Sequence, residues 1–76
     1  METAETKTIE VVVNGAAQMV PAGISLERLL EWLKIEASRV AVELDGRIVR
    51  KPDWPATQVR EGARLEVVWF VGGGTR

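Results

Sequence analysis

Two tight-turn signals, each placed between β-rich runs, constrain the fold of this chain more than any other feature. The first is Asn14-Gly15, after the run at residues 8–13, and the second is Asp45-Gly46, after the run at residues 40–44. Both pairs tolerate positive φ, which a two-residue hairpin turn requires. Each turn is followed by a return run, at residues 18–20 and residues 47–49. The sequence therefore predicts two β-hairpins, the second with a short edge strand.

One amphipathic helix is predicted between the hairpins. Pro21-Ala22-Gly23 ends the first hairpin, and Ser25 is placed to cap the helix start, with Glu27 in the first turn to favour the helix dipole. Leucines at spacing i, i+3, i+4 and i+7 form one apolar stripe: Leu26, Leu29, Leu30 and Leu33. We expect the helix to pack on a sheet through this stripe, with Trp32 at the edge of the core or, as the alternative, in contact with a partner.

The remainder of the chain predicts a connection and a final strand. Residues 51–61 hold Pro52 and Pro55 around Trp54, which favours an irregular or briefly helical segment with Trp54 over the end of the core. The last strand is predicted at residues 64–71. This order of elements is typical of an α+β protein with the β-grasp arrangement, a mixed sheet of four to five strands with one helix packed across one face.

The last strand is apolar on both of its sides, although a single helix covers only one sheet face. Leu65, Val67, Trp69 and Val71 alternate with Val68 and Phe70. One interpretation is an exposed apolar strip for partner docking, with Val68, Trp69 and Phe70 as its contact residues. The alternative is that the connection at residues 51–61 wraps over the second face and buries it.

Length and composition predict one small folded domain. The chain has 76 residues, of which 46% are hydrophobic and 28% are charged. We expect a disordered extension at residues 1–7, the β-grasp domain at residues 8–71 and a flexible tail at residues 72–76. The polar, acidic start is unlike a signal peptide, and no apolar run is long enough to span a membrane. These features predict a cytoplasmic protein.

The charges and the absent residue types limit the possible chemistry. The net charge is −1 and the basic residues are dispersed, so we expect no nucleic-acid partner. Arg47, Arg50 and Lys51 form a local cluster, which is either a solvated hairpin face or a contact for an acidic partner. The chain has no Cys, His or Tyr, which excludes a thiolate nucleophile, an imidazole base and nitrogen or soft metal ligands. We therefore expect no catalytic residue, no metal site and no enzyme activity.

Three consecutive glycines, Gly72, Gly73 and Gly74, follow the last predicted strand. Three extended residues reach about 10 Å, far enough to carry a carboxylate into a partner's active site. Lacking Cβ atoms, Gly72 and Gly73 can thread a narrow channel there. Thr75 and Arg76 come after them, so a carboxylate on Gly74 requires removal of that dipeptide.

The chain resembles the ubiquitin-like sulfur carrier proteins, and among them the thiamine-pathway ThiS subfamily. The resemblance covers residues 9–74 and is most specific in the second hairpin, VAVELDGRIV at residues 40–49, and in VVWFVGGG at residues 67–74. Asp45 stands where the subfamily usually has Asn, and Ala63 where an Asp is usual. The dipeptide Thr75-Arg76 is the main departure, because the family works through a carboxyl-terminal glycine.

The resemblance implies that Gly74 is adenylated by an E1-like adenylyltransferase that uses ATP, and is then converted to a thiocarboxylate. Sulfur would come from a cysteine desulfurase or a rhodanese, and a thiazole synthase would accept it. The carrier itself would bind no cofactor. A metallopeptidase of the deubiquitinase type would remove Thr75 and Arg76, unless these two residues were added for expression.

Four other interpretations remain open at the level of sequence. The small subunit of molybdopterin synthase shares the fold and the tail but serves another acceptor. A carrier for cysteine or for a sulfur-containing secondary metabolite would also have these features. A protein modifier would join its glycine carboxylate to target lysines. In a plain interaction module the glycines would have no chemical role.

Overall fold

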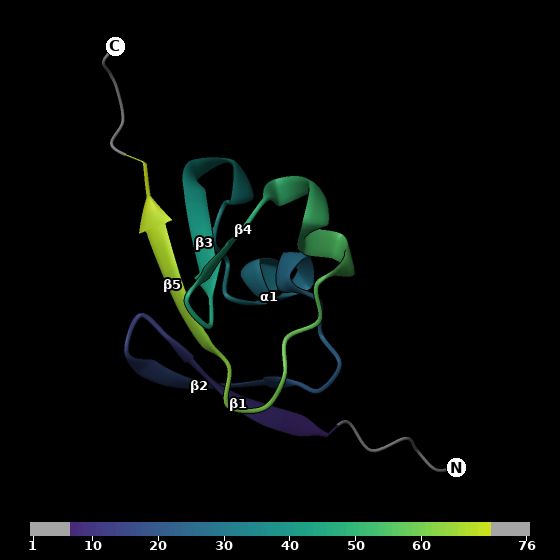
Figure 1. The fold of residues 1–76 in the computed structure, drawn as a ribbon. Coiled ribbons are helices and arrows are strands. Elements are labelled where there is room, and N and C mark those ends of the chain that lie inside the picture. Colours follow the sequence, from purple (N-terminus) through teal and green to yellow (C-terminus); the bar gives the residue numbers. More distant parts are fainter. Residues whose placement is uncertain (1–6, 71–76) are drawn as a thin grey trace.

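A computed structural model describes residues 7–70 of the chain and contains a five-stranded mixed sheet with one α-helix (Figure 1). The elements in chain order are β1 (Thr8–Val13), β2 (Ala16–Pro21), α1 (Leu26–Trp32), η1 (Ala37–Arg39), β3 (Val40–Leu44), β4 (Arg47–Val49), η2 (Lys51–Ala56) and β5 (Arg64–Trp69), where η denotes a 3-10 helix. The predicted β-grasp arrangement is confirmed.

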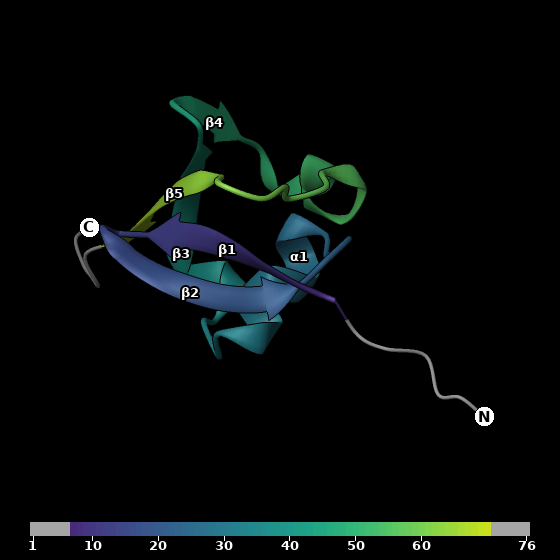
Figure 2. The ribbon, with the colours of Figure 1, turned by 90° about the horizontal axis from the view of Figure 1, so that it is seen from below.

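The strand order is β2-β1-β5-β3-β4, so the last strand of the chain lies at the centre of the sheet (Figures 1 and 2). β5 runs parallel to β1 and antiparallel to β3, while the two hairpins form antiparallel pairs on either side. A central strand is held by neighbours on both edges, which fixes its direction and register. The fold therefore places residues 64–69 on an internal strand, which pairs with β1 at residues 64 and 65 and with β3 at residues 65–69.

Both predicted hairpin turns are present and use the backbone that their sequences favour. Asn14 and Gly15 have φ of 50° and 85°, and Asp45 and Gly46 have φ of 51° and 85°. Positive φ at both central residues matches the right-handed twist of the flanking strands. β2 is longer than the predicted run at residues 18–20, because pairing with β1 begins directly after the turn.

The side chains of the two turn residues also hold β5 from its two neighbours. The Asn14 carboxamide donates through Nδ2 to the Val67 carbonyl (3.1 Å) and accepts the Val67 N–H at Oδ1 (2.7 Å). On the other side, Asp45 Oδ1 accepts the Arg64 N–H (2.9 Å). Asn14 thus extends the short β1–β5 ladder by the equivalent of one peptide unit.

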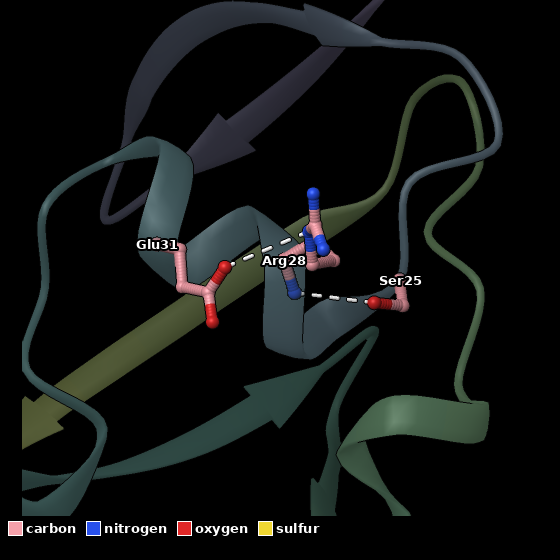
Figure 3. Close-up of polar contacts among 3 residues, drawn as sticks. All are labelled: Ser25, Arg28 and Glu31. Carbon is pink, nitrogen blue, oxygen red and sulfur yellow. Dashed lines mark hydrogen bonds and ion pairs between the residues drawn. The ribbon is translucent and has the colours of Figure 1, made fainter.

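Helix α1 begins at the predicted cap and buries the predicted stripe. Ser25 Oγ accepts the Arg28 N–H (3.1 Å), and the exposed Arg28 and Glu31 side chains form an ion pair (Figure 3). The buried members of the stripe are Leu26, Leu29 and Leu30, and Leu33 is partly buried. The prediction that Trp32 packs at the core edge is wrong, because its side chain is 55% exposed. It follows Arg28 by four residues and therefore shares that residue's solvent face.

The connection after β4 packs on the helix side of the sheet. Trp54 in η2 is buried and donates its indole N–H to the Val49 carbonyl (2.8 Å), as expected for a residue that closes the end of the core. Val59 and Ala63 from the same connection join this core. The alternative in which residues 51–61 bury the second sheet face is wrong, because Ile48 and Val68 on that face are 74% and 59% exposed.

Candidate functional site

The end of β5 presents the three residues predicted to dock on a partner. Val68, Trp69 and Phe70 are 59%, 50% and 56% exposed. Trp69 pairs with Val40, and the alternation of side chains along the strand places it on the core side of the sheet. It is nevertheless exposed, because it lies at the end of the strand. The Phe70 N–H donates to the Arg39 carbonyl (2.8 Å), so the backbone remains anchored one residue past β5. These aromatic side chains are therefore exposed on an ordered backbone, as an interface anchor requires.

The predicted chemical residues of the tail lie outside the described residues. These are Gly72, Gly73 and Gly74, together with Val71 of the predicted strand and the Thr75-Arg76 dipeptide. Residues 1–6 of the extension predicted at residues 1–7 also fall outside them. The structure therefore describes the residues predicted to dock, Val68, Trp69 and Phe70, and leaves the predictions about the tail untested.

The sheet side opposite α1, here called the outer face, carries an apolar area beside a pair of carboxylates. The registers place Ala41 opposite Val68, and Glu43 between Glu66 and Ile48. With the adjoining Val42, these residues line an open depression of about 410 Å³. An exposed apolar surface rimmed by charges is typical of a protein–protein contact.

A lysine stands at the end of the sheet from which β5 leaves. Lys51 Nζ is 5.8 Å from the centre of the Phe70 ring and 5.9 Å from that of Trp54. Arg47 is far from this lysine in the hairpin, because it pairs with Leu44 beside the turn. The predicted cluster of Arg47, Arg50 and Lys51 is therefore divided between the two ends of β4: Arg47 lies beside the turn, Arg50 and Lys51 follow the other end, and Lys51 is beside Phe70.

A second open depression, of about 610 Å³, lies beside α1. It is formed by the segment at residues 21–25 together with Arg28, Glu31 and Trp32. The ion pair of Arg28 and Glu31 within it joins Nε and Oε1 at 3.6 Å, and both side chains are well exposed. Exposed pairs of this kind contribute little to stability or specificity. None of the predicted docking residues lies here.

Between residues 7 and 70, acidic side chains are not grouped in threes close enough to hold a metal ion. In the same stretch, α1 is too short to cross a membrane.

Sequence reasoning did not single out Ile48, Glu43 or Glu66 as contact residues. Alternation within each strand places them on one face, but only the strand register brings them together.

The mixed five-stranded sheet, the single packed helix and the exposed end of the central last strand define a protein of the ubiquitin-like β-grasp class. The sequence profile of the ThiS family matches residues 4–74. The chain belongs to the ThiS family. Members of this family are small sulfur carriers rather than enzymes, so the resemblance stated from the sequence is confirmed.

Solved and curated proteins agree with this membership. The crystal structure of the thiamine biosynthesis protein ThiS from Geobacter metallireducens superposes with a TM-score of 0.77 at 33% identity, over 87% of this chain and 100% of that one. A thiazole synthase from Paramagnetospirillum magneticum is 36% identical over 67 residues, and one from Magnetococcus marinus is 35% identical over 66 residues. These cover 88% and 87% of this chain but only 21% and 20% of the two synthases, so the chain spans about a fifth of their length.

Proposed function

We propose that this protein carries sulfur as a thiocarboxylate on Gly74 and delivers it to a thiazole synthase. The family match, which runs to Gly74 and ends directly before Thr75 and Arg76, is the observation that carries the proposal. The reactive carboxylate then belongs to Gly74 once a metallopeptidase has removed the last two residues. Gly72 and Gly73 thread the partner's channel, because glycine allows close approach of the two backbones.

The first step activates the carboxylate. An oxygen of the Gly74 carboxylate bonds to the α-phosphorus of ATP in an E1-like adenylyltransferase, and pyrophosphate leaves. A persulfide held by a cysteine desulfurase or a rhodanese then attacks the acyl carbon, and AMP departs. A second thiol breaks the S–S bond, which leaves the thiocarboxylate on the carrier and a disulfide on the partner. ATP, the persulfide and the thiol all belong to partners, since this chain has neither Cys nor His.

Docking by the end of β5 would bring the tail to these partners. Val68, Trp69 and Phe70 supply an exposed apolar contact, with Trp69 and Phe70 as its aromatic anchors. The backbone of these residues is held by β3 on one side: Val68 and Trp69 pair with Ala41 and Val40, and the Phe70 N–H donates to the Arg39 carbonyl. Little backbone entropy is therefore lost when they dock.

Thiazole synthase is the acceptor that the comparisons support best. The ThiS structure is described as a thiamine biosynthesis protein, and two relatives are thiazole synthases in which a related segment makes up about a fifth of the chain. A segment joined to its acceptor in one chain is held at high effective concentration, which favours a productive encounter. No comparable observation favours the molybdopterin, cysteine, modifier or plain interaction alternatives.

Adenylation is tested by ATP–pyrophosphate exchange with a purified E1-like adenylyltransferase of the thiamine pathway. A chain ending at Gly74 should support exchange, whereas the 76-residue chain and a chain ending at Gly73 should not. Exchange of equal rate with all three chains would contradict the assignment of Gly74.

The acceptor is tested by incubating the thiocarboxylated chain with thiazole synthase and, separately, with the large subunit of molybdopterin synthase. We expect loss of the thiocarboxylate only with thiazole synthase and its substrates. Transfer to the molybdopterin enzyme alone would assign the carrier to that pathway.

A further inference from the structure

The two edges of the sheet differ in how well they are protected against pairing with another chain. In the order β2-β1-β5-β3-β4, the strands β2 and β4 each have a neighbour on one side only (Figures 1 and 2). β4 has three residues, begins at Arg47 and is followed by Arg50 and Lys51. Short length and cationic side chains are devices that keep an edge strand from accepting a further strand. The β4 edge is therefore protected.

The β2 edge lacks these devices. Its six residues, AAQMVP, carry no charge. The Met19 side chain is 57% exposed. Pro21 has no N–H and can block pairing, but it stands at the last position of the strand. Residues 16–20 thus form an uncharged edge that can accept a further strand.

The pairing of β2 with β1 determines which peptide groups of β2 point outward. The Ala22 N–H donates to the Lys7 carbonyl (2.8 Å), and the same register continues along β2. Because hydrogen bonding alternates along an antiparallel strand, the peptide groups of every second residue counted from Ala22 point toward β1. Those of Ala17 and Met19 point away from the sheet. Both side chains are exposed on the outer face, on the opposite side from the buried Val20.

These outward groups are self-complementary about Gln18. When a second copy lies antiparallel with its Gln18 opposite this one, Ala17 faces the second copy's Met19, and Met19 faces its Ala17. Each of these facing residues exchanges N–H···O=C bonds in both directions, so all of the outward groups are satisfied. A two-fold interface requires a self-complementary patch of this kind. Because β2 is uncharged, the two strands place no like charges opposite one another.

We propose that the chain forms a two-fold dimer through the β2 edge, in which residues 16–20 of two copies pair antiparallel around Gln18. The two sheets then become one continuous sheet with both copies of α1 on the same side, because the two-fold axis is perpendicular to the sheet. β1 separates β2 from β5, so Val68, Trp69 and Phe70 stay exposed in each copy. The dimer does not depend on the proposed sulfur-carrier function.

Sedimentation equilibrium of the 76-residue chain tests for the dimer. The paired strands are short, and Pro21 offers no N–H beyond them, so the association should depend on concentration. Between about 10 μM and about 1 mM, the mean mass should rise from that of one chain toward that of two. A mass that stays at one chain over this range would overturn the proposal.

Met19→Lys tests whether the association uses the β2 edge. Position 19 of one copy lies diagonally across the junction from position 19 of the other, about 7–8 Å away, so the introduced cations repel and association should weaken about tenfold. Ile48→Lys is the matched control on the β4 edge. Both side chains are exposed, and each has a glutamate opposite it on the neighbouring strand, Glu10 for Met19 and Glu43 for Ile48. The control should associate like the unsubstituted chain, and both variants should fold.

The register is tested by adding Ala17→Glu to Met19→Lys. Position 17 of one copy faces position 19 of the other, so each introduced carboxylate lies opposite an introduced ammonium group, and association should recover. Amide hydrogen exchange of the unsubstituted chain gives a second readout, since exchange at Ala17 and Met19 should slow about tenfold from low to high concentration. Failure of the double variant to recover, equal weakening by Ile48→Lys, or unchanged exchange at these two amides would overturn this interface.

Discussion

Asn14 combines two structural tasks in one side chain, and this makes it the most informative single residue of the sheet. Its backbone adopts positive φ in the first turn, and its carboxamide makes two hydrogen bonds with Val67. Sequence reasoning identified the turn from the Asn14-Gly15 pair. It did not predict the bonds to Val67, because the partner lies 53 residues away in the chain.

Asn14→Gly should separate these two tasks, since glycine accepts the turn conformation but removes the carboxamide. The part-buried Val67 peptide then loses both partners, and we expect the free energy of unfolding to fall by about 1–3 kcal/mol. Asp45→Gly is the matched control, because it removes one exposed hydrogen bond from the equivalent turn position. Urea unfolding followed by tryptophan fluorescence provides the measurement. Equal losses in the two variants would contradict the special role of Asn14.

Trp69→Ala and Phe70→Ala should each weaken binding to the adenylating enzyme by about tenfold, while the fold remains intact. The reason is that both side chains are at least half exposed in the isolated protein and are placed to become buried on docking. Titration calorimetry measures the affinity, and circular dichroism checks the fold.

Trp32→Ala is the control for these two substitutions. Trp32 is 55% exposed, like Trp69, but it stands on α1 beside a different depression. Its replacement should leave the affinity unchanged. If Trp32→Ala weakened binding while Trp69→Ala and Phe70→Ala did not, the contact would belong to the helix.

At the scale of elements, short α1 depends on packing more than on its own helical propensity. It has seven residues, fewer than an isolated helix needs in water, and buries three leucines against the sheet. Leu29→Ala should therefore lower the free energy of unfolding by about 2–5 kcal/mol, because Leu29 is fully buried. Arg28→Ala removes only an exposed ion pair and should change stability by less than about 0.5 kcal/mol. Similar losses from both substitutions in urea unfolding would contradict this account.

The elements could be predicted from sequence because their signals are local. Two turn pairs, one serine cap and one leucine stripe specify the hairpins and the helix. Trp32 was misplaced because it adjoins the stripe in sequence, although the helical period turns it toward solvent. The pairing of Glu43 with Glu66 depends on strand register, which the local pattern does not specify.

At the scale of the whole molecule, the fold separates stability from recognition. The helix, η2 and the inner sheet face form the core, whereas the outer face and the end of β5 remain exposed. The central strand β5 connects the core with the exposed outer face, because it contributes Leu65 and Val67 to the core and Val68 to the surface. Under the proposed function, the contact surface would stay rigid while the chemistry occurs on the residues that follow it.

Intact-mass measurement tests the central claim most directly. The 76-residue chain and a chain ending at Gly74 are each incubated with ATP, a sulfide source and the adenylating enzyme. The account predicts that only the shorter chain gains the mass of one oxygen replaced by one sulfur, and that fragmentation places the change on Gly74. If the enzyme adenylates a known carrier under the same conditions but neither chain changes, this protein does not carry sulfur on Gly74.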